Sequence, residues 1–485
     1  MLFLAVMQGH PTVQEIFAEG LRHHQSGQLE AAERLYREAL AVDPDDPDSL
    51  HFLGVLTHQM RRDEAAADLI SRAVAINPNL ASWHSNLGNV HQDHERLDEA
   101  IACYRRAIEV RSDFPDAHSN LGTALKRLGR LDEATACYRQ AIALNPHYAD
   151  AHNNLGMALL AQGDMAEGWR EHEWRWQTAQ MRAGFREFSQ PQWRGEAAPG
   201  RTLLIHAEQG FGDTLQFCRY APLAAARGLR VVMQVPRPLQ RLLGSLAGVD
   251  QVIADGEEPP PFDLHCPMLS LPVALGTTLA TVPDGAAYLQ ADARQVAVWR
   301  ARLAMMVNQG PKIGLVWAGS AHRHLPDQLT VDRRRSIDPA RLAPLFALSK
   351  LHFISLQKDG PPPPPDFRIT DCMGEMADFS DTAALIANLD LVISVDTAVA
   401  HLAAALGKPV WLLDRFDACW RWLVGRRDSP WYPTLRLYRQ KRPYDWDSVV
   451  AEVAEDLGRQ YRVAGADATP APARASLWRR FRRGA

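Results

Sequence analysis

Small residues recur at a fixed interval along the first third of the chain, and the apolar residues between them follow helical spacing. Within each interval of 34 residues, glycine holds one position and alanine holds two, at Gly20, Gly54, Gly88, Gly122 and Gly156, at Ala32, Ala66, Ala100 and Ala134, and at Ala39, Ala73, Ala107 and Ala141. Small side chains at such positions let two helices cross closely. The pattern therefore predicts an array of helix pairs.

A 34-residue unit of two helices is typical of the tetratricopeptide repeat, and "AHSNLGTALKRLGRLDEATACYRQAIALNP" (117–146) is close to its ideal form. We assign residues 1–180 to an α-solenoid of about five units. The last unit ends in "EGWREHEWRWQ", whose Trp169, Trp174 and Trp176 are expected to dock the array onto the part that follows. Such arrays are binding surfaces rather than catalysts, so we expect a protein partner.

One repeat position carries asparagine in three successive units, at Asn86, Asn120 and Asn154. A side-chain amide both donates and accepts hydrogen bonds, so a row of amides can hold the backbone of an extended polypeptide. The alternative is that each amide only bonds its own neighbours within the array. The three residues are candidates for partner binding.

The pattern changes after residue 180. Residues 181–200 are interpreted as a linker, and from residue 201 continuous apolar runs alternate with small-residue loops and helices. Apolar runs of this kind are typical of parallel strands that are buried on both faces. We predict two Rossmann-like lobes, 201–308 and 309–463, followed by an Ala/Pro linker and a basic tail at 464–485. The fold class is thus an α-solenoid joined to a two-lobed α/β part.

The stretch "LVISVDTAVAHLAAALGKPVWLL" (391–413) contains an apolar strand that stops at Asp396 and Thr397, with His401 one helical turn further on. Ligands bind at the carboxyl ends of strands in open α/β sheets. Asp396 or Thr397 can cap the following helix, and the free amides of its first turn form an anion site. His401 can hydrogen-bond a phosphate or a ribose. The alternatives are a simple cap and a histidine that is satisfied within the protein.

A diphosphate needs cations as well, because the helix dipole contributes only about 0.3–1 kcal/mol at an exposed end. The candidates are Lys358, just past a strand, and Arg335, the last of three consecutive arginines before the next predicted helix. Gly319 and Ser320, in the small-residue loop that ends the stretch "PKIGLVWAGS" (311–320), complete the candidate donor-binding set. An arginine run is more often a solvated face.

Composition and motifs exclude several functions. The formal net charge of −4 argues against nucleic acid, and six cysteines without a C-x-x-C pair indicate neither disulfides nor a zinc cluster and fit a reducing cytoplasm. No G-x-G-x-x-G, G-x-x-x-x-G-K-[ST] or G-x-S-x-G occurs. Asp445-Trp-Asp447 opens a predicted helix and is interpreted as an N-cap, so no metal site is expected. The basic tail is either a solubilising end or a contact with the anionic inner membrane surface.

The stretch "SVDTAVAHLAAALGKPVWLL" resembles the donor-site motif of glycosyltransferase family 9, the ADP-heptose heptosyltransferases, and "EQGFGDTLQFCRYAPLAAARG" resembles the glycine loop of its acceptor lobe. This resemblance implies a GT-B fold, a nucleotide-sugar donor (ADP- or UDP-linked) in the second lobe, and inverting transfer without a metal or other cofactor. By position, Asp213 would be the general base, with Gly210 and Gly212 in the glycine loop. Asp396, Thr397 and His401 would hold the donor.

The resemblance leaves the acceptor open among a saccharide, a lipid-linked molecule and a protein. Two other readings also stay open. One is a non-catalytic scaffold in which only the repeats work, and the other is a protein O-glycosyltransferase resembling the O-GlcNAc transferases.

Overall fold

The structure, a computed structural model, describes residues 11–182, 184, 186–283, 287–307, 310–319 and 326–461, with only the backbone for 326–330. Ser320 and the tail 464–485 lie outside the described residues. The chain forms two compact units, of which the first comprises Met1–Ser189, Ser270–Val282 and Phe416–Gly425 and the second comprises the remainder. The tetratricopeptide array therefore shares a unit with two short segments that come from the α/β part of the sequence.

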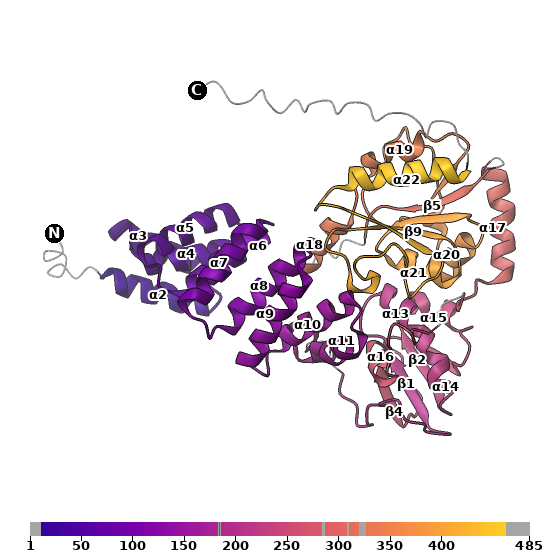
Figure 1. Cartoon of the computed structure of the whole chain (residues 1–485), viewed down its shortest axis with the longest axis horizontal. Helices are drawn as coiled ribbons and strands as arrows, with labels where there is room; N and C mark the ends of the chain where they lie inside the picture. Colours follow the sequence, from indigo (N-terminus) through magenta and orange to yellow (C-terminus); the bar gives the residue numbers. More distant parts are fainter. Residues whose placement is uncertain are drawn as a thin grey trace. The chain divides into compact units, whose positions relative to one another are not determined.

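The predicted array is confirmed as five helix pairs within the described residues (Figure 1). Their bounds are α2 Val13–Gln25, α3 Leu29–Val42, α4 Pro47–Gln59, α5 Asp63–Ile76, α6 Ala81–Asp93, α7 Leu97–Val110, α8 Pro115–Arg127, α9 Leu131–Leu144, α10 Ala149–Gln162 and α11 Met165–His172. The repeated glycine faces the second helix of its own pair. An added Cβ at Gly88 would lie 2.5 Å from the ring of Tyr104, and one at Gly122 would lie 2.8 Å from the ring of Tyr138. The missing side chain thus makes room for the buried tyrosine.

The last helix pair is covered by the two segments that join the first unit. Trp169 is only 2% exposed, and its ring packs edge-on against Trp420 with centroids 5.1 Å apart. Arg175, in the short helix η1 (Glu173–Gln177), donates to Ser270 Oγ at 2.8 Å. Trp174 instead stacks on His152 inside the array, with centroids 4.0 Å apart. Trp169 thus meets a following segment, as expected.

The first lobe of the second unit contains a parallel sheet in the order β3-β2-β1-β4. The strands are β1 Thr202–His206, β2 Arg230–Val235, β3 Gln251–Ala254 and β4 Leu264–Pro267, and the helices are α13 Phe211–Phe217, α14 Ala221–Ala225 and α15 Arg237–Leu243. Part of the expected linker is built into this lobe, because Gln192 bridges His265 of β4 and Trp193 is fully buried.

The second lobe contains a six-stranded parallel sheet in the order β10-β9-β8-β5-β6-β7. The strands are β5 Lys312–Val316, β6 His352–Ser355, β7 Ile369–Asp371, β8 Leu391–Val395, β9 Val410–Asp414 and β10 Leu435–Arg439. The helices are α17 Ala293–Met306, α18 Pro326–Arg335, α19 Ala343–Phe346, α20 Phe379–Ile386, α21 Ala398–Ala405 and α22 Trp446–Tyr461. The two parallel sheets confirm the predicted two-lobed α/β part.

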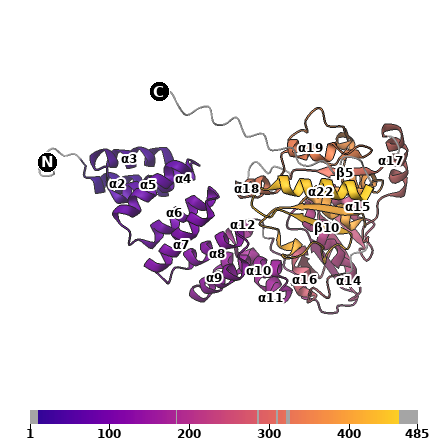
Figure 2. The ribbon, with the colours of Figure 1, turned by 45° about the horizontal axis from the view of Figure 1, so that its top comes forward.

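Helices cover both faces of the six-stranded sheet (Figures 1 and 2). The helix α22 packs Val449, Val450 and Val453 onto the sheet core beside α19. Asp445 accepts a hydrogen bond from the Ser448 amide at 3.2 Å, which confirms its interpretation as an N-cap. Although α17 falls within the range predicted for the first lobe, 201–308, the Asn388 side chain of the second lobe donates to the carbonyl of Val296 in α17 at 3.1 Å.

We expect Trp169→Ala to lower the free energy of unfolding of the first unit by about 3–5 kcal/mol, because the substitution leaves a cavity against Trp420. Urea denaturation followed by circular dichroism measures the change. Val42→Ala, at a side chain that is 61% exposed, is the control and should change it by less than about 0.5 kcal/mol. Equal losses in the two variants would show that Trp169 does not anchor the end of the array.

Candidate functional site

The strand order of the second lobe reverses between β5 and β8, because β6 and β7 lie on one side of β5 and β8, β9 and β10 lie on the other. In open α/β sheets the loops at such a reversal diverge and leave room for a ligand beyond the carboxyl ends of the strands. The loop after β5 carries Gly319, and the loop after β8 carries Asp396 and Thr397. The structure thus brings these predicted donor residues to one edge of the sheet.

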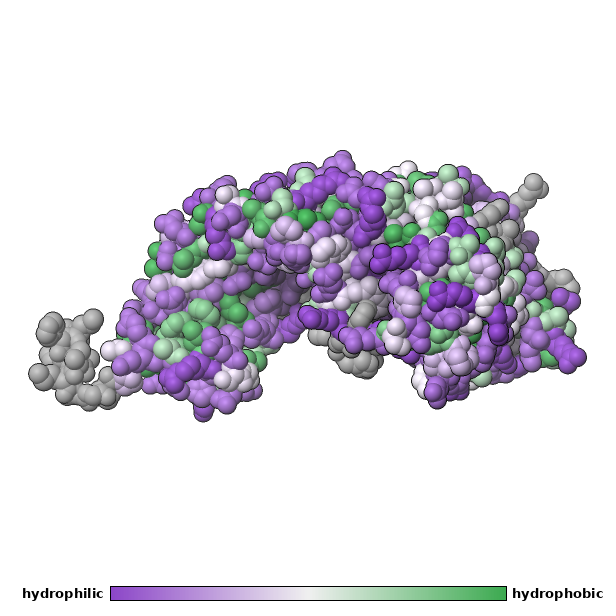
Figure 3. Space-filling view, turned by 90° about the horizontal axis from the view of Figure 1, so that it is seen from below, coloured by the Kyte–Doolittle hydropathy of each residue, from purple (hydrophilic) through white to green (hydrophobic). Residues whose placement is uncertain are grey.

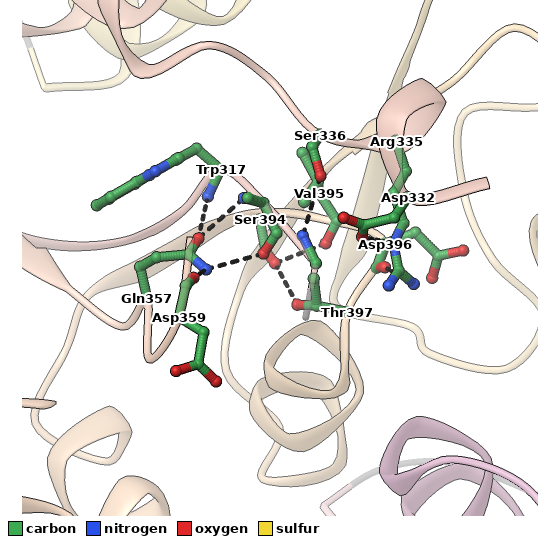
Figure 4. Close-up of polar contacts among 12 residues, drawn as sticks. Trp317, Asp332, Arg335, Ser336, Gln357, Asp359, Ser394, Val395, Asp396 and Thr397 are labelled. Carbon is green, nitrogen blue, oxygen red and sulfur yellow. Dashed lines mark hydrogen bonds and ion pairs between the residues drawn. The ribbon is translucent and has the colours of Figure 1, made fainter. Parts of the chain in front are cut away.

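The loop after β5 is held by Gln357, which follows β6 (Figure 4). The Gln357 side-chain oxygen accepts from the amides of Trp317 and Ala318 at 3.0 and 2.9 Å, and its nitrogen donates to the Ala318 carbonyl at 3.0 Å. Gly319 donates its amide to Ser336 Oγ at 3.2 Å. Gln357 was not predicted as a site residue, because a side-chain bond to a loop distant in the chain leaves no local pattern in the sequence.

The loop after β8 leads into α21, and Thr397 is the backbone N-cap of that helix. Its hydroxyl makes no capping bond and instead lies 3.0 Å from Ser394 Oγ. The expected side-chain cap is therefore absent at Thr397. The first amides of a helix have no acceptor within the helix, so the start of α21 presents donors at the strand edge.

Arginine and aspartate side chains lie around this edge (Figure 4). Arg335 donates from Nε to Asp332 at 3.0 Å and from Nη1 to the Asp396 carbonyl at 3.3 Å, so it is fixed beside the predicted anion site. An added Cβ at Gly319 would overlap the side chains of Asp332 and Arg335. Lys358 is exposed, and its side chain makes no hydrogen bond or ion pair with another residue that the structure describes.

His401 lies in the first full turn of α21 and is buried. Its Nδ1 is 2.9 Å from the hydroxyl of Tyr432, and its Nε2 is 3.9 Å from a carboxylate oxygen of Asp396. Its ring also faces the first lobe, since an added Cβ at Gly212 would lie 3.0 Å from His401 Cδ2. The predicted histidine is therefore at a junction of the two lobes as well as at the strand edge.

Asp213 lies in the first turn of α13, next to this junction. Asp213 is the third residue of the helix and not its N-cap. Its Oδ2 accepts a hydrogen bond from the Gly210 amide at 3.1 Å. Gly210 is the N-cap residue. The structure thus brings Gly210, Gly212 and Asp213 of the first lobe to the helix that carries His401.

A fully buried carboxylate, that of Asp414, also lies at this edge of the sheet. Asp414 ends β9, is 0% exposed and accepts from Arg439 Nε at 2.8 Å. Burial raises the pKa of Asp414 to about 6, with Arg439 opposing the shift and Asp396 adding to it. No pattern in the sequence distinguished Asp414 from other residues at strand ends. The part of the chain that the structure describes holds no cluster of three or more His, Cys, Asp or Glu side chains arranged for a metal ion.

The three asparagines of the array are half-buried, and each is bonded across repeats. Asn86 lies 3.0 Å from His51 Nε2, Asn120 donates to Asn89 at 3.1 Å, and Asn154 accepts from Lys126 Nζ at 3.4 Å. The face of the molecule in Figure 3 shows mostly hydrophilic side chains with apolar patches along the array. The role of the three asparagines in partner binding stays a prediction.

Among the described helices, none is long and apolar enough to cross a bilayer.

Two known families match parts of the chain. Residues 23–88, 93–129 and 124–163 match tetratricopeptide repeats, and residues 364–413 match glycosyltransferase family 9 (heptosyltransferase). The chain thus carries tetratricopeptide repeats, and its residues 364–413 are similar to glycosyltransferase family 9. That segment runs from the loop before β7 through most of β9 and includes Asp396, Thr397 and His401.

Known proteins resemble this chain over parts of its length. Protein FlbA of Caulobacter vibrioides is 28% identical over 326 residues, which are 61% of this chain and 53% of FlbA. The chain thus spans about half the length of this curated relative. Among solved structures, MamA is 22% identical with a TM-score of 0.31, covering 34% of this chain and 97% of MamA. YrrB, described as a TPR protein with an unusual peptide-binding site, is 19% identical with a TM-score of 0.32, covering 36% and 90%.

Gly212→Ala should lower the free energy of unfolding of the second unit by about 1–3 kcal/mol, because the added methyl group presses on the His401 ring. Thermal unfolding measures this loss. Gly374→Ala is the matched control, since a Cβ there meets no atom within 4 Å. If both variants unfold at the wild-type temperature, the close contact of α13 with α21 is not part of the folded state.

The buried carboxyl of Asp414 predicts a pH dependence. Because its pKa is raised in the folded state, the unfolded chain ionises first as pH rises from about 4 to 6, so stability falls by up to about 3 kcal/mol across that window and no further above it. Asp414→Asn should remove this fall, whereas Asp366→Asn, at an exposed carboxylate, should keep it. Urea denaturation at a series of pH values measures it. An unchanged pH profile in Asp414→Asn would contradict the assignment.

Proposed function

We propose that the protein transfers a sugar from a nucleotide-sugar donor, bound in the second lobe, to an acceptor hydroxyl in the first lobe, with inversion and without a metal. The observation that carries this proposal is the contact of Gly212 with His401, since it sets the glycine loop of one lobe against the donor-side helix of the other. The family 9 match over residues 364–413 supports the reaction class.

The donor diphosphate is assigned to the start of α21. Its first-turn amides donate to phosphate oxygens, and Arg335 and Lys358 supply positive charge. His401 and Thr397 add hydrogen bonds from the same edge. The strand order reverses between β8 and β5, and the loop that carries Gly319 follows β5, on the side of this reversal opposite α21. Gln357 holds this loop in place. Spreading charge over these groups favours departure of the nucleoside diphosphate.

The acceptor is activated by Asp213 as general base. Its carboxylate takes the proton of the acceptor hydroxyl while the hydroxyl oxygen bonds the anomeric carbon and the bond from that carbon to the diphosphate breaks on the opposite face. One displacement of this kind inverts the configuration at the anomeric carbon. Asp213 is only partly exposed, as a base held at the contact of two lobes should be.

We infer that the array recruits a protein, which is either the acceptor itself or a targeting partner. Asn86, Asn120 and Asn154 lie at one repeat position and keep polar groups at a half-buried surface. The known role of tetratricopeptide repeats in protein binding supports this part of the proposal.

The decisive experiment screens nucleotides and nucleotide sugars by thermal shift and then measures transfer. A ligand at a hundred times its Kd stabilises the protein by about 2.7 kcal/mol. Asp213→Asn should lower transfer by about 10²–10⁴-fold and leave nucleotide affinity near wild type. His401→Ala and Asp396→Ala should weaken nucleotide binding, and Lys358→Ala should weaken it most at low salt.

Asp366→Asn is the control for Asp213→Asn and should keep full transfer. Transfer at the wild-type rate in Asp213→Asn would remove this residue from the mechanism. Normal donor binding in all three second-lobe variants would show that the donor lies elsewhere. A wild-type protein that binds no nucleotide sugar but binds a protein partner would instead be a scaffold.

A further inference from the structure

The two lobes of the second unit touch at several places near the candidate site. At the start of α13, the ring of Phe211 packs against Phe379, with centroids 5.1 Å apart. Arg241 of α15 pairs with Asp378 at 2.6 Å and also contacts Asp381. The contact of Gly212 with His401 is made by the same turn of α13. A further contact, just beyond the end of α13, differs from these because it is buried and charged.

That contact is made by Arg219, which is 4% exposed. Its guanidinium donates to the carbonyl of Gln216 at 2.8 Å, to the carbonyl of Trp431 at 2.6 Å and to the hydroxyl of Tyr288 at 2.9 Å. Among the described residues, no carboxylate pairs with it. Trp431 belongs to the second lobe, so Arg219 joins the end of α13 to that lobe through neutral acceptors.

Aromatic rings surround the same guanidinium. Its carbon lies 4.4 Å from the centroid of the Tyr288 ring, 4.6 Å from that of Tyr432 and 5.7 Å from that of Trp431. Rings at these distances attract a cation through their π faces. Burying a charge without a counter-ion is costly, and an apolar side chain would fill such a space more cheaply. The arginine therefore specifies the geometry of this junction more than it stabilises the fold.

Tyr432 connects the arginine to His401. Burial raises the pKa of the Tyr432 hydroxyl, with Arg219 opposing the shift, so the phenol keeps its proton. The Tyr288 hydroxyl donates to the Leu215 carbonyl at 2.8 Å and lies 3.5 Å from the Tyr432 hydroxyl, whereas His401 Nδ1 lies only 2.9 Å from it. The Tyr432 hydroxyl and His401 Nδ1 thus form a hydrogen bond, while His401 Nε2 is the ring nitrogen nearer Asp396.

These contacts close a ring. The end of α13 reaches Arg219, Arg219 holds Tyr432, Tyr432 orients His401, and His401 meets Gly212 at the start of α13. The helix that carries Asp213 is thus held at both ends against the helix that carries His401. Neither Arg219 nor Tyr432 is exposed, so neither is placed to touch a substrate.

We propose that Arg219 and Tyr432 are positioning residues that hold α13, and with it Asp213, in register with His401 across the two lobes. The inference rests on the proposed function for the roles of Asp213 and His401. Misplacing reacting groups by about 1 Å can lower a rate by about 10²-fold, so the register matters for the chemical step more than for binding.

The test compares Tyr432→Phe, Arg219→Lys and Arg219→Met with Tyr438→Phe. Tyr438 is the matched control because it is equally buried in the same lobe and its hydroxyl donates to Asp456 at 2.8 Å, away from this ring of contacts. Two quantities are measured on the full chain, the kcat and donor KM of transfer and the amide hydrogen exchange of α13 and α21. The second measurement needs no turnover.

We expect Tyr432→Phe and Arg219→Met to lower kcat by about 10- to 10²-fold with little change in donor KM, and to speed exchange in both helices together. Arg219→Lys should recover part of both effects, and Tyr438→Phe should show neither. A rise in donor KM that matches the loss in kcat, or exchange in α13 that stays at the wild-type rate, would overturn the positioning role.

The outcome also separates this inference from the proposed function. If the wild type transfers no sugar but the amide exchange of α13 and α21 rises together in Tyr432→Phe, the positioning role stands and the proposed reaction fails. If transfer occurs and Tyr432→Phe behaves like Tyr438→Phe in both measurements, the reaction stands and the positioning role fails.

Discussion

The approach of α13 to α21 depends on an absent side chain. Because Gly212 has no Cβ, the His401 ring can lie against the backbone of the first lobe, and a methyl group there would press on the imidazole at 3.0 Å. The candidate carboxylate, Asp213, follows at the next position, so the same contact decides how far it lies from the strand edge that carries Asp396. Much of what this unit can do chemically therefore rests on close packing of two short helices from different lobes.

The array uses the same device for a different purpose. Glycine on one helix accommodates a tyrosine on the next, as Gly88 does for Tyr104, and repetition of this fit generates the solenoid. Repeats contact only their neighbours, so the last pair must be covered by something else. Trp420, Leu279 and Leu423 do this from segments distant in sequence, where Leu279 and Leu423 cover Gly163. The end of the array is thus built by residues outside the repeat.

Charged side chains lie in two kinds of environment. Many ion pairs of the array, such as Arg106 with Glu109 or Arg130 with Glu133, are largely solvent-exposed and contribute little each. The α/β unit instead buries Arg219 among aromatic rings and Asp414 beside Arg439. Buried charges are sensitive to small displacements because their environment cannot relax as water does. Both lie close to the candidate site, where geometry matters most.

The sequence by itself determined the elements whose signals are local. The 34-residue period predicted the helix pairs, continuous apolar runs predicted the central strands, and "SVDTAVAHLAAALGKPVWLL" located Asp396, Thr397 and His401 at a strand end. The edge strands β7 and β10 were not predicted, because β7 has only three residues and is not fully buried, and β10 lies in a segment without a clear apolar run. Only the tertiary structure decided that Gln357 holds the Gly319 loop, that Arg219 and Tyr432 meet, and that residues 416–425 belong with the array. The reason is physical: these contacts join residues far apart in the chain, and their partners are chosen by packing in three dimensions, which no local pattern of residues records.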